Sequence, residues 1–296
     1  MMKRRQFFGY CLLFIGGCTS AQVSSSNSTN VNQPEKLRFA VTDVQGLEDL
    51  ESNYGKFRQT LEQVLETPIE FFPVESYTAA AVALQSNQVD LVLTGPSEYV
   101  VINARTKAVP MIALARQNYY SVIAVPANSP IESLTDLKGK TVGLKKIGST
   151  SGHLGPTKLL MDAGLEPNVD YQMEMLSLQD RTDALLNGSV DAWGGSLVDY
   201  QRSVLTDGNS EPDFSIIAQS SSLPNDVIMV SSLIDPNLVT SYKQSILDSQ
   251  DQLLKALVVS EETQKYQGAK FVEAQDSDYN VIREVYKAMG AENLIQ

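Results

Sequence analysis

The stretch Gly148-Ser149-Thr150-Ser151-Gly152-His153-Leu154 follows an apolar run at 141–144 and precedes a segment with helical spacing around 159–161. This order predicts a strand, a turn and the start of a helix. The first N–H groups of a helix lack internal partners and carry about half a positive charge, so they favour a phosphate-like oxyanion. Ser and Thr are also common helix caps. The stretch therefore predicts an α/β unit and leaves two interpretations open, an anion site and an ordinary cap.

The same alternation of apolar runs and helical spacing extends along most of the chain. Alternating strands and helices predict a mostly parallel sheet, with ligands at the carboxyl ends of the strands. After residue 236 the pattern becomes helical with polar outer faces. The expected strands are 37–41, 69–74, 89–95, 109–115, 119–125, 141–145, 171–176, 190–194 and 214–218, and the expected helices are 54–65, 77–84, one from 96, 151–163, 180–186, 237–267 and 279–289.

Two extended runs, 119–126 and 222–230, are predicted to cross between two lobes. The first lobe would comprise 36–123 together with 226–296, and the second lobe 124–225. The two crossings would then act as a two-strand hinge.

The N-terminus is typical of an exported lipoprotein. A basic start, Lys3-Arg4-Arg5, precedes a short apolar stretch that ends in Ile15-Gly16-Gly17-Cys18. This resembles a bacterial lipobox, with 1–17 as signal peptide and a lipid on Cys18. Residues 19–35 are rich in Ser, Asn, Thr and Gln and are predicted to be a flexible tether. We expect a periplasmic protein held to a membrane by this lipid alone; the export route and the membrane stay open.

Charge and cysteine content exclude several kinds of partner and chemistry. Removal of 1–17 leaves 20 basic and 35 acidic residues, a formal net charge of −15. Such a chain is a poor ligand for nucleic acid or for anionic lipid headgroups. Because no cysteine follows Cys18, the folded part has no disulfide, thiolate nucleophile or Cys-ligated metal. We expect no cofactor and no metal.

The chain resembles the phosphonate- and phosphite-binding proteins of ABC importers over essentially all of 36–296. The most specific part of the resemblance is Ser149-Thr150-Ser151-Gly152. The resemblance implies a bilobed type II periplasmic binding protein, with two sheets flanked by helices, that works as a monomer with permease and ATPase subunits. Supporting segments are 89–96, 136–142, 188–192 and 223–226.

The resemblance also implies ligand-binding roles for individual residues. Ser149, Thr150 and Ser151 match the segment that grips the phosphonate oxygens. Tyr77 matches a tyrosine that reaches the ligand, and Thr94 lies where relatives often carry a tyrosine. Asp226 matches an acidic residue in the second crossing, which would accept a proton from a P–OH group of the ligand.

The chain departs from its relatives at several positions. A histidine of some relatives would fall near 177–178 and is missing. An acidic position of the family aligns with Val198 or with Asp199, and both stay open. Trp193 is predicted either to pack in the core or to form an apolar wall facing a P–H or P–CH3 group. His153, the single histidine, is a further candidate for ligand contact.

These features favour a high-affinity binding protein for phosphite, methylphosphonate or a related phosphonate. One histidine and no cluster with metal-ligand spacing argue against an enzyme on the same fold. A phosphate-binding receptor and a receptor that presents its ligand to a sensor remain alternatives. The ligands differ by one substituent, and the sequence does not decide among phosphite, methylphosphonate, aminoethylphosphonate and phosphate.

Overall fold

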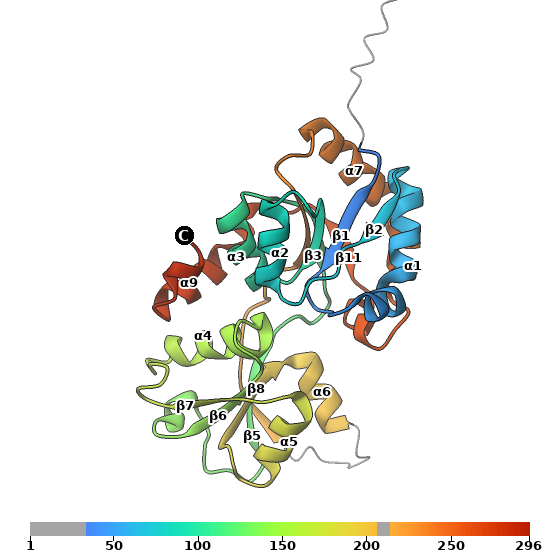
Figure 1. Ribbon diagram of the computed structural model, residues 1–296. Helices are drawn as coiled ribbons and strands as arrows, with labels where there is room; N and C mark the ends of the chain where they lie inside the picture. The colour runs from blue at the N-terminus through green and yellow to red at the C-terminus, as the bar shows by residue number, and fades with distance from the viewer. Residues whose placement is uncertain (1–33, 206–213) are drawn as a thin grey trace, which may run out of the picture. The chain divides into compact units, whose positions relative to one another are not determined.

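Two β-sheets organise the chain in the computed structural model, which describes residues 34–205 and 214–296, with all of their side chains except those of 77, 78, 204 and 205 (Figure 1). The predicted signal peptide, Cys18 and the tether up to residue 33 lie outside the described residues.

The first sheet has six strands in the order β11-β4-β10-β3-β1-β2. Its central strands are buried along their whole length, because continuous apolar runs such as 91–93 face helices on both sides. The strands are β1 (Leu37–Val41), β2 (Ile69–Phe71), β3 (Leu91–Thr94), β4 (Val109–Ala115), β10 (Asp226–Val230) and β11 (Lys270–Val272).

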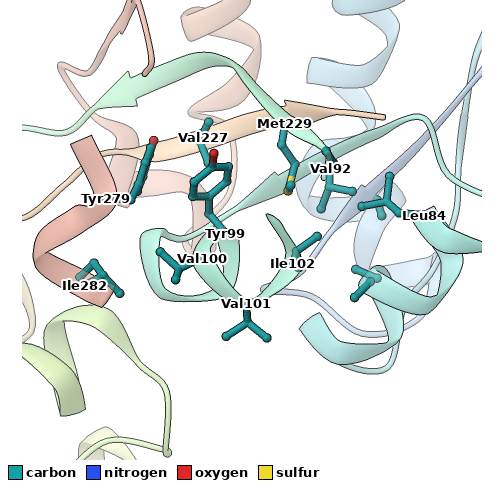
Figure 2. Packing of buried hydrophobic residues seen from close by; sticks show 14 of the residues in the cluster. Leu84, Val92, Tyr99, Val100, Val101, Ile102, Val227, Met229, Tyr279 and Ile282 are labelled. Atoms are coloured by element: carbon teal, nitrogen blue, oxygen red, sulfur yellow. The ribbon is translucent and has the colours of Figure 1, made fainter. Parts of the chain in front are cut away.

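Helices cover both faces of this sheet. Figure 2 shows the face on which α2, α3 and α9 pack, where Val92 and Met229 from the sheet meet Tyr99 and Ile282 from the helices. On the other face, Phe39 of β1 packs against Phe57 of α1, with ring centroids 6.2 Å apart. The helices of this lobe are α1 (Leu47–Leu65), α2 (Tyr77–Gln85), α3 (Pro96–Thr106), α7 (Pro236–Asp248), α8 (Gln250–Leu257) and α9 (Asn280–Ala288), with the short turns η3 (Glu262–Tyr266), η4 (Asp276–Tyr279) and η5 (Glu292–Leu294).

The second sheet has five strands in the order β7-β6-β8-β5-β9. Alternate residues of β5 face opposite sides: Ile123 packs in the cluster under α4, and Val122 in the cluster under α5 and α6. The elements are β5 (Ser121–Pro126), η1 (Leu134–Leu137), β6 (Thr141–Leu144), η2 (Thr150–Leu154), α4 (Gly155–Asp162), β7 (Gln172–Met175), α5 (Leu178–Leu186), β8 (Ala192–Ser196), α6 (Leu197–Leu205) and β9 (Phe214–Gln219).

Two short segments connect the sheets, 116–120 between β4 and β5 and 220–225 between β9 and β10. Most of the crossing predicted at 119–126 is therefore strand β5 of the second sheet, and the expected lobe boundary between 123 and 124 falls inside that strand. The second predicted crossing, 222–230, likewise ends in strand β10 of the first sheet.

Both sheets are mixed, which corrects the expectation of a mostly parallel sheet. Parallel ladders join β1 to β2 and β3, and β6 to β7 and β8. The strands next to the connecting segments, β4, β5, β9 and β10, pair antiparallel. Within the described residues, no helix combines the length and apolar character needed to cross a bilayer.

Candidate functional site

A cavity of about 440 Å³ is lined by residues from both lobes. The wall of the cavity is mostly polar. The loops that follow the carboxyl ends of β1, β3, β6 and β8 contribute residues to this wall. The lining residues are Asp43, Gly95, Glu98, Arg116, Tyr119, Lys145, Lys146, Ser149, Thr150, Ser151, Leu178, Ser196, Val198, Asp199, Arg202, Asp226, Glu261, Glu262 and Lys265.

The loop from β6 to α4 forms one wall of this cavity. Gly148, shortly before η2, has a φ of 86°, a conformation that non-glycine residues rarely adopt. Ser149 then caps the π-helical turn η2, its side chain accepting a hydrogen bond from the N–H of Gly152. At Gly155 the backbone runs so close to β5 that an added Cβ would lie 1.9 Å from Oγ of Ser121. The loop is therefore held tightly against β5.

The start of η2 leaves two backbone donors for a ligand. The N–H of Ser149 donates to the carbonyl of Lys146, 3.1 Å away. The N–H groups of Thr150 and Ser151, in contrast, have no acceptor within the described part of the chain, as expected for the first turn of a helix. All three residues line the cavity, so the predicted Ser-Thr-Ser segment lies where a cavity ligand would meet it.

The hydroxyl of Thr150 is engaged with the other lobe. It accepts a hydrogen bond from the N–H of Ser97 at 3.1 Å and donates to Oγ of Ser97 at 2.9 Å. Ser97 in turn donates to Oε2 of Glu98 at 2.9 Å. The beginnings of η2 and α3 thus face each other at the cavity through this chain of hydrogen bonds.

Cations lie beside the predicted acidic residue Asp226. Arg116, directly after β4, pairs with the Asp226 carboxylate at 3.4 Å, and its guanidinium stacks on the Tyr119 ring, 3.9 Å from the centroid. Lys265, from the C-terminal part of the chain, forms an ion pair with Asp43. These cations neutralise the two carboxylates with which they pair at the place where an anion would bind.

Three predicted ligand residues do not line the cavity, which corrects those expectations. Thr94 is buried, and its hydroxyl is hydrogen-bonded to that of Thr42 at 2.9 Å. His153 is also buried, and its Nδ1 accepts the N–H of Gly148 at 3.2 Å. Burial lowers the pKa of His153 to about 4, so this side chain is a neutral support of the loop.

Trp193 is the third of these residues. Its side chain is 2% exposed and packs in the cluster under α5 and α6, so it is a core residue and not a ligand wall. The Arg181 guanidinium lies 4.5 Å from its ring centroid. Tyr77 begins α2, but its side chain lies outside the described residues.

Val198 and Asp199 both line the cavity, so the wall includes both candidates for the family's acidic position. Other cavity residues were missed by sequence reasoning. Arg116 had a usable signal, because it directly follows a predicted strand. Lys265 and Glu261 had none, because only tertiary packing brings the segment around η3 to the cavity.

This arrangement is suited to binding an anion. Two unpaired N–H groups, neighbouring hydroxyls and cations can replace the hydration shell of an oxyanion. The single histidine of the chain does not line the cavity, so it is not placed to act as a base for the cavity serines. Within the described residues, no cluster of three or more His, Cys, Asp or Glu could hold a metal ion.

Comparisons with known proteins agree on the family. Residues 39–279 match the family described as "ABC transporter, phosphonate, periplasmic substrate-binding protein". The chain is 23% identical to the phosphate-import protein PhnD of Mycolicibacterium smegmatis, over 95% of this chain and 94% of that protein. It is 27% identical to a probable phosphite-binding protein, PhnD1, of Prochlorococcus marinus, over 50% of this chain and 52% of that protein.

Solved structures share the fold. PhnD1 of Prochlorococcus marinus in complex with methylphosphonate has a TM-score of 0.66 and 18% identity, over 88% of this chain and all of that chain. The aliphatic sulphonate-binding protein SsuA of Escherichia coli has a TM-score of 0.62 and 19% identity, over 89% of each chain. The fold is that of a type II periplasmic binding protein, and the chain belongs to the family of periplasmic substrate-binding proteins of phosphonate ABC transporters.

Proposed function

We propose that this protein captures a small phosphorus oxyanion, phosphite or methylphosphonate, for an ABC importer, and that the Ser149–Ser151 segment grips its oxygens. The observation that carries the proposal is the pair of unpaired N–H groups, those of Thr150 and Ser151, at the wall of the cavity. The hydroxyls of Ser149 and Ser151 add further donors. A charged acceptor strengthens each such hydrogen bond to about 1.5–3 kcal/mol.

Arg116 and Asp226 would act together on the ligand. A guanidinium has five donors, and the Asp226 carboxylate occupies one of those on Arg116 at 3.4 Å. Arg116 would donate to an ionised oxygen, while Asp226 would accept the proton of a P–OH group. The substituent on phosphorus would then face Leu178 and Val198, the two aliphatic side chains of the cavity wall.

Phosphate is the second candidate ligand. The cavity wall is mostly polar, and Trp193 does not contribute the apolar surface that was expected to reject phosphate. A relative over nearly the whole chain is named a phosphate-import protein. A receptor that presents phosphate to a transporter or a sensor therefore remains the alternative.

We base the proposed partners and the proposed membrane attachment of the protein on its family and on its N-terminal sequence. The protein would deliver its ligand to permease and ATPase subunits as a monomer, without catalysis of its own. A lipid on Cys18 would hold it to the membrane through the tether 19–35.

Calorimetric titration with phosphite, methylphosphonate, aminoethylphosphonate and phosphate tests the proposal. We expect phosphite or methylphosphonate to bind most tightly. Ser151→Ala should weaken binding about tenfold, the loss of one charge-assisted hydrogen bond. Ser133→Ala, which removes the cap of η1 away from the cavity, is the matched control and should bind normally. Unchanged affinity in both Ser151→Ala and Thr150→Ala would place the site elsewhere.

A further inference from the structure

We propose that Glu98 takes up a proton when the oxyanion binds and then donates a hydrogen bond to it, so that ligand capture is coupled to protonation of the protein. The inference rests on the proposed function and adds a residue that neither the sequence nor the family resemblance had indicated. No covalent step is involved; the proton comes from solvent and returns there when the ligand leaves.

The position of the Glu98 carboxyl group is the first argument. Glu98 lies in the first turn of α3 and lines the cavity. Its carboxyl group folds back over the helix start, because a Cβ built on Gly95 would lie 2.6 Å from Oε2. The carboxyl group therefore occupies the end of α3 that would itself attract an anion.

Hydrogen bonds connect Glu98 to the proposed position of the ligand. Two hydrogen bonds, each 2.9 Å long, lead from Oε2 of Glu98 through Oγ of Ser97 to Oγ1 of Thr150. Thr150 also carries one of the two unpaired N–H groups. An oxyanion held by those groups would therefore lie close to the Glu98 carboxyl group, and two negative charges in one small cavity repel each other strongly.

The charged surroundings of Glu98 are the third argument. Burial and the nearby Asp43 carboxylate raise the pKa of Glu98 to about 7, and Asp226 acts in the same direction, although hydrogen bonds from the N–H of Glu98 and from Ser97 lower it. Lys265 and Arg116 are paired with those two carboxylates. The other charged or titratable groups of the cavity wall are Tyr119, Lys145, Lys146, Asp199, Arg202, Glu261 and Glu262.

The negative charge of an incoming anion shifts the protonation equilibrium of Glu98 further towards its protonated form. A protonated carboxyl group has one O–H donor, whereas the ionised form only accepts hydrogen bonds. Protonation thus removes a repulsive charge and supplies a hydrogen bond at the same time. Asp226 would still accept a hydrogen bond from the P–OH group of the ligand. Glu98 would donate a hydrogen bond to an ionised oxygen of the same ligand.

Proton uptake can be measured directly by calorimetry. Titration of the purified protein with methylphosphonate at pH 7, in buffers that differ in ionisation enthalpy, gives the number of protons bound per ligand. Wild type should take up about half a proton more than Glu98→Gln, because the free carboxyl group is about half ionised at that pH. Subtraction of the two values removes the titration of the ligand itself. Glu292→Gln, which changes an exposed carboxylate of η5 that does not line the cavity, should match wild type.

The outcomes separate this inference from the proposed function. Binding of methylphosphonate with equal proton uptake in wild type and Glu98→Gln overturns the inference alone, and Glu98 is then a helix-capping acid. No binding of methylphosphonate, phosphite or phosphate overturns the proposed function and the inference with it. If Glu98→Gln does not fold, infrared difference spectra of wild type decide: a protonated-carboxyl band that appears with ligand supports the inference, and its absence refutes it.

Discussion

Replacement of Thr150 by valine removes one hydroxyl and keeps the shape of a buried side chain. The substitution breaks both hydrogen bonds to Ser97 and leaves the buried N–H of Ser97 without an acceptor. A buried donor without a partner costs about 1–3 kcal/mol. The unfolding free energy should fall by about that amount. Ligand affinity should fall roughly tenfold, about 1.4 kcal/mol, because the start of η2 loses its contact with α3.

The matched control is Thr157→Val in the adjacent helix α4. Thr157 is also buried, but its hydroxyl donates to the sulfur of Met173 at 4.0 Å and lies beside the Tyr171 hydroxyl, so it supports no buried backbone N–H. Urea denaturation and calorimetric titration of both variants provide the comparison. Thr157→Val should stay within about 0.5 kcal/mol of wild type in both measurements. If Thr150→Val behaves like Thr157→Val, the contact between η2 and α3 does not support the site.

Four other predictions follow from particular side chains. His153 binds a proton below about pH 6.5 in the unfolded state but only below about pH 4 in the folded state. The unfolding free energy should therefore fall by up to about 3 kcal/mol between these pH values, and urea denaturation should show a weaker pH dependence for His153→Gln. Gly155→Ala should lower the melting temperature, because the new methyl group would overlap Ser121; an unchanged value would contradict the close packing of α4 on β5. Arg116→Gln should weaken oxyanion binding at least tenfold by calorimetry, with intact circular dichroism; normal affinity would exclude contact with the ligand. Cys18→Ala should release the protein from the membrane fraction, and retention of the variant there would contradict the lipid anchor.

The sequence predicted the individual elements better than their arrangement. Strands β1 and β4 have the expected limits, 37–41 and 109–115, because apolar runs with clear flanking residues define them locally. Helix α1 begins at Leu47 and not at 54, since Leu50 is the one buried apolar residue among the acidic and polar residues of its first turns. The antiparallel strands were missed because strand direction depends on which strands pair, and no local pattern reports it.

In the candidate site, too, local sequence patterns identified some residues, whereas tertiary packing decides the position of others. Ser149–Ser151 could be found from sequence because a strand, small hydroxyl residues and a helix follow one another directly. Trp193 packs in the core, one of the two interpretations that the sequence left open; the ligand-wall interpretation arose because the expected strand, 190–194, placed it close to a strand end, whereas it is the second residue of β8. Lys265 could not be found, since it reaches the cavity only through the packing of η3.

A crystal structure of the complex with methylphosphonate tests the central claim most directly. The account predicts the phosphorus centre in the cavity, with its oxygens within hydrogen-bond distance of the N–H groups of Thr150 and Ser151 and of the Arg116 guanidinium. A ligand that binds outside the cavity, or inside it without contact to either N–H group, would contradict the account.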